Sequence, residues 1–562
     1  MKWIICLIGY CMLLLPSFAQ SRPTAVDNSW YHDKTVREYV LGSAEQLMGL
    51  SKLVAEGENF AGKIIVLQND INVTSYVWHP IGTREHPFAG ILDGAGCMVS
   101  IGKIYPGELG GMFGVLSGGT IRNLSVSIVE EQESVDTIGG ITALADLGST
   151  IEYCVHVDTL SARNAVVMGG IAGLSEGKVS SCCNNGGLSN KNENENVLGG
   201  IVGISSGVVV GSHNKAFVSG TNICGGIIGK GDQTHGHSQV HGCSNEGKVY
   251  VESTDEKNTD AMAGGIAGRA DGVEMTECCN TAVVSAYCYK NRNRAISSYA
   301  YAGGLIGVGY GAISASYNIG EVASRCVAET SGVVDGVAYV YSGGLIGYNR
   351  DNAMSTLSYS YNAGYIYAFG YGKNGTSLNY GGVVGDFAAF MPRMKCCYYI
   401  EGDGHGEGIG EGTSFLHRDV GVQVSSLQLQ TPDFLHSGNR NVLGLNDNNS
   451  FVFDSARKNK GFPVLNKVQT IGFSRMTDNV LLLKGKTAMS GQKGFYYWIA
   501  GLEDYVAEIE ADTDFEYQLK GIQQGQDCFF QAFVKRPDGT VAKGEVVRFR
   551  LSASASNQSI RK

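Results

Sequence analysis

The sequence predicts an all-β protein: a parallel β-helix (solenoid) with an N-terminal helical cap and a C-terminal β-sandwich. First, 79 of the 562 residues are Gly while 43% are hydrophobic, a combination that suits short apolar strands joined by tight turns. Second, a Gly-Gly-apolar motif recurs every 26–40 residues, which is the spacing of repeat architectures. Third, the segment from about residue 467 has no Gly-pair repeats and consists of strands of alternating polarity.

Residues 1–19 are predicted to be a signal peptide, because one Lys precedes an apolar run that ends in Ser17-Phe18-Ala19. We therefore expect an exported protein, located on the bacterial cell surface or outside the cell. No later stretch is apolar for 18 residues, so we expect no membrane span after cleavage. The charge balance is acidic, with a formal net charge of -10 and no basic stripe, which argues against nucleic acid as a partner.

Residues 20–105 are predicted to form the N-terminal capping segment of the solenoid. Ser43 and Gln46 match a capping box at a helix start. Leu47, Leu50 and Val54 then form a helical apolar stripe that ends near Gly57. Such a helix can cover the open end of a solenoid, whose strand edge would otherwise aggregate.

Residues 106–400 are predicted to be the β-helix repeats. The Gly pairs start at Gly110, Gly139, Gly169, Gly199, Gly225, Gly264, Gly303, Gly343 and Gly381. Each later pair is followed by a recurring Asn, and these are Asn184, Asn214, Asn245, Asn280, Asn318 and Asn362. Stacked coils place equivalent residues about 4.8 Å apart, so we expect the amides to form a ladder. A propeller needs about four strands per blade, which the shorter repeats hold poorly. The later repeats are longer and predict loops that bulge from one corner.

The remaining segments are a C-terminal cap or connector at 401–466, a β-sandwich at 467–553 and a loose tail at 554–562. The connector contains a candidate helix near Ser425–Leu435. The sandwich is predicted from strings such as GFYYWIAG and DGTVAKGEVVRF, which alternate apolar and polar residues.

These motifs resemble a known family. Gly303-Gly304-Leu305-Ile306-Gly307, with Ser316-Tyr317-Asn318, resembles the GLUG motif of bacterial surface and adhesin-like proteins, a motif first noted near immunoglobulin A peptidases. The resemblance covers about residues 36–466. The last segment resembles a fibronectin type III-like domain of bacterial surface proteins, with Phe529 or Phe530 where that family usually has Tyr. The resemblance implies a non-catalytic, adhesin-like surface protein.

Thirteen Cys remain after the signal peptide is removed, and they include three vicinal pairs: Cys182-Cys183, Cys278-Cys279 and Cys396-Cys397. Neighbouring strand residues point to opposite faces, so we expect one Cys of each pair to be buried as a small hydrophobe. No zinc-type CxxC spacing occurs.

Catalytic signals are weak, and we predict that the protein is not an enzyme and has no catalytic residues. Ser175 and Ser205 lie in G-x-S-x-G strings, but both occupy the same repeat position, as expected for a solenoid turn and not for a nucleophile elbow. The alternative is a polysaccharide-degrading β-helix enzyme. Its candidate residues occur in loops at unequal repeat positions: Asp232, Arg269, Asp271, Arg350 and Asp351.

Metal signals are also weak, and we predict no metal site and no cofactor. His235, His237 and His241 share one face of an extended segment, yet such residues are more often solvated. The acidic stretch Glu401–Glu407 lacks the pattern of a calcium loop and is interpreted as a connector.

Tyr is concentrated late in the repeats, where 17 of the 28 Tyr lie between Tyr287 and Tyr399. A candidate binding stripe precedes two consecutive Gly pairs and consists of Tyr299, Tyr301, Tyr339 and Tyr341. Tyr provides rigid amphipathic contact area, so we expect a glycan or protein ligand on a cell surface or matrix. Two alternatives stay open: aromatic stacking that only stabilises the coils, and a scaffold for partner proteins.

Overall fold

The computed structural model describes residues 26–551, with gaps at 191–194, 234–237, 255–259, 293–296, 331–335, 351–354, 389–392, 401–407, 410–420, 437–449, 456, 458, 478, 500–504, 510–513, 523–524 and 538. The predicted signal peptide and the predicted tail therefore lie outside the described residues. Within these ranges, no helix is long and apolar enough to cross a membrane.

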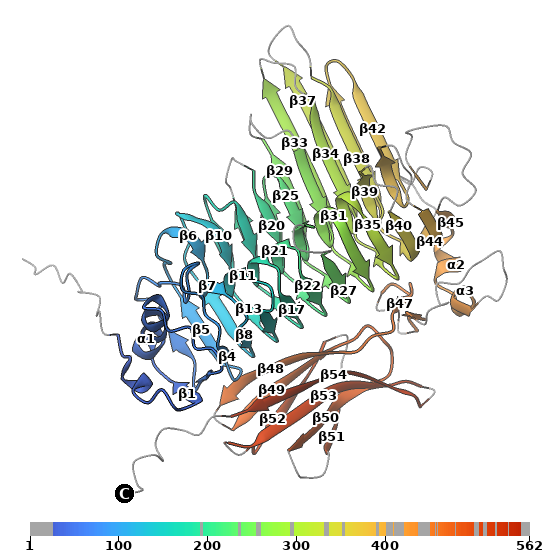
Figure 1. The fold of residues 1–562 in the computed structure, drawn as a ribbon. Coiled ribbons are helices and arrows are strands. Elements are labelled where there is room, and N and C mark those ends of the chain that lie inside the picture. Colours follow the sequence, from blue (N-terminus) through green and yellow to red (C-terminus); the bar gives the residue numbers. More distant parts are fainter. Residues whose placement is uncertain are drawn as a thin grey trace, which may run out of the picture.

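The predicted fold class is confirmed, because the chain forms stacked parallel sheets followed by a separate antiparallel sandwich (Figure 1). Each coil begins with a strand that ends at the first Gly of a Gly pair. These strands form a nine-stranded sheet: β6 (Gly107–Gly110), β10 (Val135–Gly139), β15 (Val167–Gly169), β20 (Val197–Gly199), β25 (Ile223–Gly225), β30 (Asp260–Gly264), β34 (Ser298–Gly303), β38 (Ala338–Gly343) and β42 (Thr376–Gly381).

After the Gly pair, each coil contributes up to three short strands to a 29-stranded sheet. These strands form the first, second and third segments of the coil. The first segment comes directly after the Gly pair: β7 (Phe113–Leu116), β11 (Thr142–Ala145), β16 (Ala172–Ser175), β21 (Val202–Ser205), β26 (Ile228–Gly231), β31 (Ala267–Thr276), β35 (Ile306–Ser314), β39 (Ile346–Asn349) and β43 (Val384–Phe387). The second segment runs through all the coils, and between β27 and β40 it is formed by the second halves of β31 and β35. Its other strands are β1 (Glu38–Leu41), β2 (Ile64–Leu67), β4 (Ile91–Asp93), β8 (Thr120–Arg122), β12 (Thr150–Glu152), β17 (Lys178–Ser180), β22 (Val208–Val210), β27 (Gln239–His241), β40 (Thr356–Asn362) and β44 (Arg393–Ile400).

A third segment carries the recurring Asn, and a fourth completes the coil. The third comprises β3 (Ile71–Asn72), β5 (Met98–Ile101), β9 (Ser125–Ile128), β13 (Val155–His156), β18 (Cys183–Asn184), β23 (His213–Asn214), β28 (Ser244–Asn245), β32 (Cys279–Asn280), β36 (Tyr317–Asn318) and β45 (Val422–Val424). The fourth is a seven-stranded sheet: β14 (Leu160–Ala162), β19 (Leu188–Asn190), β24 (Val218–Gly220), β29 (Val249–Ser253), β33 (Val284–Arg292), β37 (Val322–Thr330) and β41 (Ile366–Gly372).

The Gly pairs are required by close packing at this bend, both within one coil and against the next coil. Gly303 pairs in register with Gly343 of the next coil. A Cβ added at Gly303 would lie 1.8 Å from the carbonyl oxygen of Ile306, and one at Gly304 would lie 2.0 Å from that of Gly344. Both distances are far below a van der Waals contact, so larger residues cannot occupy this bend.

A second corner, between the second and third segments, uses one left-handed residue per coil. These residues have φ between 48° and 63° and are Asn123, Tyr153, Ser181, Gly211, Gly242, Glu277, Ala315, Tyr359 and Cys396. A left-handed residue reverses the local direction of the backbone without a longer loop, at a cost of about 1 kcal/mol for a residue with a Cβ. Only two of the nine are Gly, so composition gives no sign of this corner.

The longer late repeats extend their strands. β33, β37 and β41 together with β34, β38 and β42 form a two-layered projection, which we name the wing (Figure 1). The prediction of bulging loops was therefore incomplete, because many of the added residues lengthen the strands. The turn Gly372–Gly375 joins β41 to β42 at the tip of the last coil.

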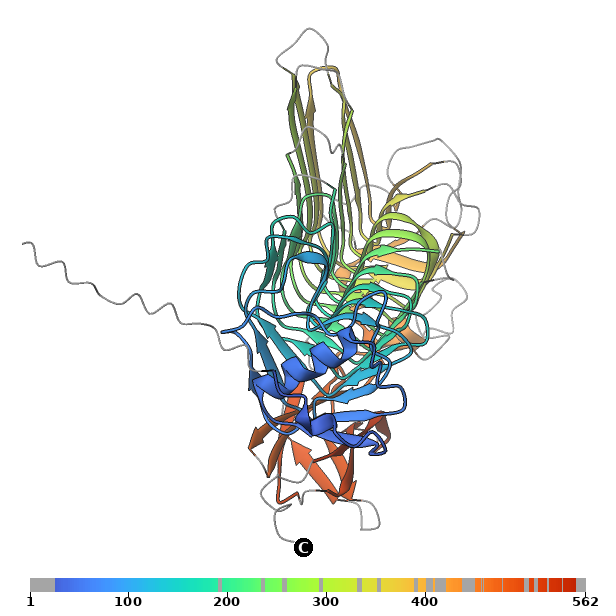
Figure 2. The same ribbon diagram turned by 60° about the vertical axis from the view of Figure 1, so that its left-hand side comes forward.

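The helix α1 (Ala44–Ala55) covers the N-terminal end of the solenoid (Figure 2). It follows the 3-10 helix η1 (Ser29–Tyr31). Ser43 accepts a hydrogen bond from the Gln46 backbone N–H at 3.2 Å, but the Gln46 side chain accepts from Gly42, so the cap differs from a reciprocal capping box by one residue. Leu47, Leu50 and Val54 are fully buried against the first coils.

The C-terminal connector holds two short helices, α2 (Ser426–Leu429) and α3 (Pro432–His436), where one helix was predicted. Ser425 and Gln428 form a complete capping box at α2. The paired strands β46 (Phe451–Val452) and β47 (Val464–Leu465) follow, and Phe451 packs on Tyr361 of the solenoid.

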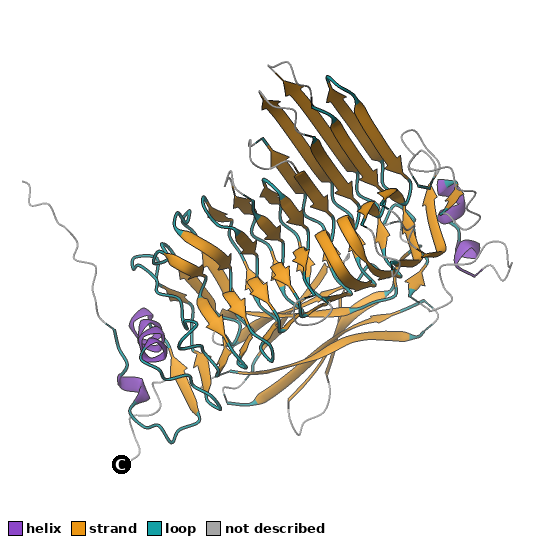
Figure 3. Cartoon of the chain, turned by 45° about the horizontal axis from the view of Figure 1, so that its top comes forward, coloured by secondary structure: helices purple, strands orange, loops and turns teal. Residues whose placement is uncertain are grey.

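The C-terminal sandwich consists of a three-stranded and a four-stranded antiparallel sheet. The first contains β48 (Gln469–Thr477), β49 (Val480–Lys486) and β52 (Asp514–Lys520); the second contains β51 (Tyr505–Ile509), β50 (Gln492–Ile499), β53 (Asp527–Lys535) and β54 (Val541–Arg550). The domain lies alongside the solenoid and does not extend beyond its end (Figure 3).

The strand β48 runs along the left-handed corner. The side chain of Gln469 lies beside Gly211 and donates to the carbonyl oxygen of Gly242 at 2.8 Å, while the Arg475 N–H donates to Gly96 at 3.0 Å. Six strand residues span about 20 Å and four coil spacings span about 19 Å. The match lets one strand contact successive coils.

Candidate binding surfaces and the internal ladder

The six predicted ladder residues form one continuous chain of amides. Each Nδ2 donates to the Oδ1 of the next coil at 2.7–2.8 Å, from Asn184 through to Asn362. All six side chains are fully buried. From Asn214 onward, each Nδ2 also donates to the carbonyl oxygen two residues later in its own coil. The ladder thus satisfies buried polar groups and offers no surface to a ligand.

The ladder begins at a histidine that sequence reasoning missed. His156 lies in register with Asn184, and its Nδ1 lies 2.7 Å from Asn184 Oδ1. Because Asn184 Oδ1 is an acceptor, we assign the proton to Nδ1. Burial lowers the pKa of His156, so the imidazole is neutral at pH 7. The signal was its spacing of 28 residues before Asn184.

The four predicted binding tyrosines form two stacked rows on the wing. Tyr299 stacks on its register partner Tyr339 with ring centroids 4.8 Å apart, and Tyr301 stacks on Tyr341 at 4.9 Å. The two rows differ in accessibility. Tyr341 is buried and also contacts Tyr348 at 4.9 Å. Burial raises the pKa of the hydroxyl groups of both Tyr301 and Tyr341.

Tyr301 and Tyr341 therefore fill the inner corner between the nine-stranded sheet and the body. Tyr301 and Tyr348 pack on a small apolar cluster of Ile223, Met262 and Val308. The outer pair, Tyr299 and Tyr339, is partly exposed. Tyr301 is partly exposed as well, but its ring packs on this cluster, so the outer pair offers the stacked rings with the fewest contacts to the body.

A second aromatic surface lies on the opposite layer of the wing, and sequence reasoning missed it. The guanidinium carbon of Arg325 lies 5.4 Å from the Tyr287 ring centroid and 5.0 Å from that of Phe369, which is cation–π geometry. Beside Phe369, which is 38% exposed, Tyr367 and Tyr371 are more than half exposed. The signal was the alternation of aromatic and other residues from Tyr365 to Tyr371.

The serines of the G-x-S-x-G strings point into the solenoid. Ser175 and Ser205 are register partners on β16 and β21 and are almost completely buried. Their hydroxyl oxygens make no hydrogen bond within the described structure. Neither hydroxyl is presented to solvent, as a nucleophile elbow would require.

The candidate charged residues form two parallel ion pairs. Lys230 pairs with Asp232 at 3.5 Å, and Arg269 pairs with Asp271 at 2.9 Å. Lys230 and Arg269 are register partners, so the expectation of unequal repeat positions was wrong for these residues. The different lengths of the preceding repeats had concealed the equivalence.

Arg350 occupies the equivalent position in a later coil. Its N–H donates to the carbonyl oxygen of Gly309, which places Arg350 opposite Tyr310. Tyr310 is in turn the register partner of Asp271. Asp351 lies outside the described residues.

The predicted histidine and acidic clusters are mostly outside the described residues, including His235, His237 and the stretch 401–407. His241 is described, and its Nε2 lies 3.7 Å from Glu277. In the part of the chain that is described, no group of three His, Cys, Asp or Glu could hold a metal ion.

All thirteen cysteines of the described chain are buried. The expectation that only one Cys of each vicinal pair is buried was therefore wrong. Cys182 faces the coil interior, as predicted. Cys279 and Cys396 face outward but are covered by the C-terminal connector, where they pack in a cluster with Phe451 and Phe462.

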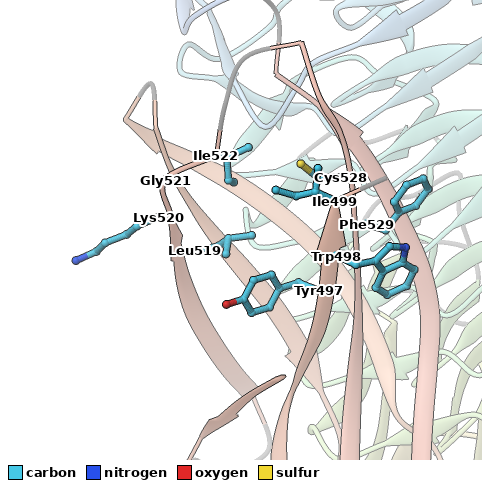
Figure 4. Close-up of a pocket in the computed structure, with 9 residues that line it drawn as sticks. All are labelled: Tyr497, Trp498, Ile499, Leu519, Lys520, Gly521, Ile522, Cys528 and Phe529. Carbon is cyan, nitrogen blue, oxygen red and sulfur yellow. The ribbon is translucent and has the colours of Figure 1, made fainter. Parts of the chain in front are cut away.

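The sandwich contains an apolar cavity of about 250 Å³ (Figure 4). Tyr497, Leu519 and Cys528 line it between the two sheets, and Trp498 and Phe529 lie at its margin, stacked with centroids 5.5 Å apart. Lys520 points away from the cavity. None of the residues labelled in Figure 4 directs a charged group into the cavity. These residues therefore provide no charged group that would orient a polar ligand.

Comparisons with known proteins add little to this geometry. No family model matches the sequence, and no curated protein matches it. A solved structure, described as "a putative immunoglobulin A1 protease from Bacteroides ovatus", is similar over 76% of this chain and 92% of that chain, with 15% identity and a TM-score of 0.31. At these values the likeness carries no functional argument.

Proposed function

We propose that this chain is an exported, non-catalytic bacterial surface protein, adhesin-like, whose β-helix binds glycans or proteins of a host, a cell surface or a matrix. The observation that carries the proposal is the partly exposed stack of Tyr299 on Tyr339. Two flat rings held 4.8 Å apart by neighbouring coils form a rigid platform. Tyr rings offer apolar faces and polar edges with little entropy to lose on binding, which suits both sugar rings and protein side chains.

The position of the platform supports the same proposal. The wing projects from the body of the solenoid (Figure 1), so its outer surfaces are separated from the region covered by the sandwich. The predicted signal peptide and the resemblance to GLUG-motif proteins support export and surface location. Against the alternative of a polysaccharide-degrading enzyme, the carboxylates of Asp232 and Asp271 lie beside cations of their own coils.

The test is a glycan-array and cell-binding assay on the exported chain. We expect Tyr299→Ala combined with Tyr339→Ala to abolish binding without changing thermal stability by more than a few degrees, because both rings are partly exposed. Tyr301→Ala combined with Tyr341→Ala should instead lower stability, because those rings are packed. Tyr105→Ala is the matched control, since Tyr105 is 53% exposed and far from the wing. Unchanged binding by the Tyr299 and Tyr339 variant would refute the proposal.

A further inference from the structure

The wing ends in two strand edges that no described strand covers. β41 is the last strand of the seven-stranded sheet, and β42 is the last strand of the nine-stranded sheet. The opposite end of the solenoid is covered by α1. Uncovered edges present rows of N–H and C=O groups that pair readily with another strand.

Hydrogen bonding identifies which groups face the open edge. The carbonyl oxygen of Tyr365, the residue before β41, accepts a hydrogen bond from Val322 N, so alternate residues from Tyr365 onward bond to β37. The backbone groups of Ala368 and Gly370 therefore point outward. In the same way, Gly375 O accepts from Ala338 N, so the backbone groups of Leu378 and Tyr380 point away from β38.

The apolar side chains between the two layers of the wing are also left uncovered at this edge. Leu378 is the register partner of Val340, and Tyr380 is that of Ser342. Val340 and Ser342 are fully buried, whereas Leu378 is 42% and Tyr380 39% exposed. The side chains of the last coil thus occupy core positions but lack the next layer of neighbours.

We propose that the wing edge is the contact surface for a second copy of this chain. β41 and β42 run in opposite directions and are joined by the Gly372–Gly375 turn. A two-fold axis perpendicular to these strands and to the solenoid axis places β41 antiparallel to its own copy and does the same for β42. Both open edges are then paired at once, which a single added strand cannot achieve. The same axis sets the two solenoid bodies at opposite ends of the joined wings.

The hydrogen-bond directions allow several registers for this contact, and the one that pairs β41 over its whole length is centred on Phe369. Ala368 and Gly370 face the edge, so Ala368 of one copy exchanges hydrogen bonds with Gly370 of the other. The two-fold axis then passes between the two Phe369 residues, which form a non-hydrogen-bonded pair with Cα atoms about 4.5 Å apart. Tyr367 of one copy lies opposite Tyr371 of the other, so the aromatic surface becomes continuous across both copies. This inference does not depend on the proposed ligand binding.

The first experiment is sedimentation velocity of the full chain over micromolar concentrations. The wild type should show a reversible monomer–dimer equilibrium. Tyr367→Glu combined with Tyr371→Glu places like charges opposite each other twice, and should weaken the dimer by about tenfold. Tyr367→Lys combined with Tyr371→Glu places opposite charges in the same positions and should restore it. These side chains are exposed in the single chain, so neither variant alters the core.

The second experiment tests the register by disulfide cross-linking after mild oxidation with oxidised glutathione. Phe369→Cys should form a cross-linked dimer, while Val546→Cys, an exposed position on the sandwich, should not. The native cysteines are buried and should leave the wild type uncross-linked. A wild type that remains monomeric up to about 100 µM in sedimentation velocity would overturn the proposal, and so would a dimer that neither responds to the charge variants nor cross-links through Phe369→Cys.

Discussion

The side-chain amide of Asn280 donates to the Oδ1 of Asn318 at 2.8 Å, although 38 residues separate them in sequence. The two residues are register partners on β32 and β36, so the bond links one coil to the next. The same relationship recurs along the ladder, and each amide is both donor and acceptor. Neighbouring hydrogen bonds in such a chain polarise one another, which ties the stability of each coil to that of its neighbours.

Asn280→Ala should destabilise the protein by about 2–3 kcal/mol. The substitution leaves Asn245 Nδ2 and Asn318 Oδ1 each without one buried partner, and an unsatisfied buried group costs about 1–3 kcal/mol. Urea denaturation monitored by far-UV circular dichroism measures the loss. Asn185→Ala is the control, because Asn185 is exposed beside the ladder, and it should change stability by less than about 0.5 kcal/mol. Equal effects of the two substitutions would contradict a structural ladder.

Cys278 should tolerate Ser but not Val. Its thiol lies 3.4 Å from the carbonyl oxygen of Thr276. At the equivalent position two coils later, the hydroxyl of Ser360 donates to Ser358 O at 2.8 Å. Both side chains are second donors to the carbonyl oxygen that precedes the left-handed corner, beside the N–H of Gly242 or Ala315. Cys278→Ser should therefore change the free energy of unfolding by less than about 1 kcal/mol, and Cys278→Val, which loses one hydrogen bond, should lower it by about 0.5–1.5 kcal/mol. If the Cys278→Val variant is as stable as the Cys278→Ser variant in chemical denaturation, the thiol contributes only by filling space, and the prediction is wrong.

Stability should fall as the pH drops below about 6.5. Burial lowers the pKa of His156, and burial with nearby Lys486 and Lys215 lowers the pKa of His213 well below its usual value. Histidines in the unfolded chain titrate near pH 6.5, so below that pH the unfolded state binds protons that the folded state does not. The free energy of unfolding should decrease by up to about 1.4 kcal/mol per histidine for each pH unit down to the folded pKa.

Denaturation between pH 8 and pH 5 checks this slope, and His156→Asn should remove the contribution of His156 and leave those of the other histidines. A slope that is the same for the wild type and the variant would contradict the assignment to His156.

Docking of the sandwich should depend on Gly96. This residue has φ +78°, and an added Cβ would lie 2.9 Å from both Arg475 N and the Phe473 ring. Gly96→Ala should therefore separate β48 from the solenoid and raise the radius of gyration in small-angle X-ray scattering. Gly118→Ala is a matched control, since Gly118 has φ +68° with no atom within 4 Å of the added Cβ. The Gly118→Ala variant has a similar backbone strain but no clash with the sandwich. An increase in the radius of gyration for both variants would contradict the proposed docking contact at Gly96.

Features that repeat in register were predictable from the sequence, whereas features that depend on folded packing were not. The Gly pairs and the ladder Asn, such as Asn318, occur in successive coils because each coil makes the same close backbone contact and buries the same amide. They therefore appear in the sequence as one repeated motif. The left-handed corner is occupied by residues as different as Tyr153 and Ala315, because the surrounding coils impose its conformation.

The partners of surface residues were also hidden from the sequence. Arg325 lies between Tyr287 and Phe369 only because the three residues are register partners on successive strands of coils with unequal lengths. The sandwich docks through backbone groups such as the N–H of Arg475, which leave no residue pattern. The lateral position of the domain was for that reason not predictable.

The most direct test of the stacked solenoid is a set of pulsed electron paramagnetic resonance distances between spin labels. Lys178 is exposed on the row of register partners that continues through Ala312, Thr356 and Arg393. Labels at Lys178 paired with each of these three sites should give distances that increase by about 4.8 Å per coil. Distances that do not rise in these equal steps would contradict the in-register stack of coils.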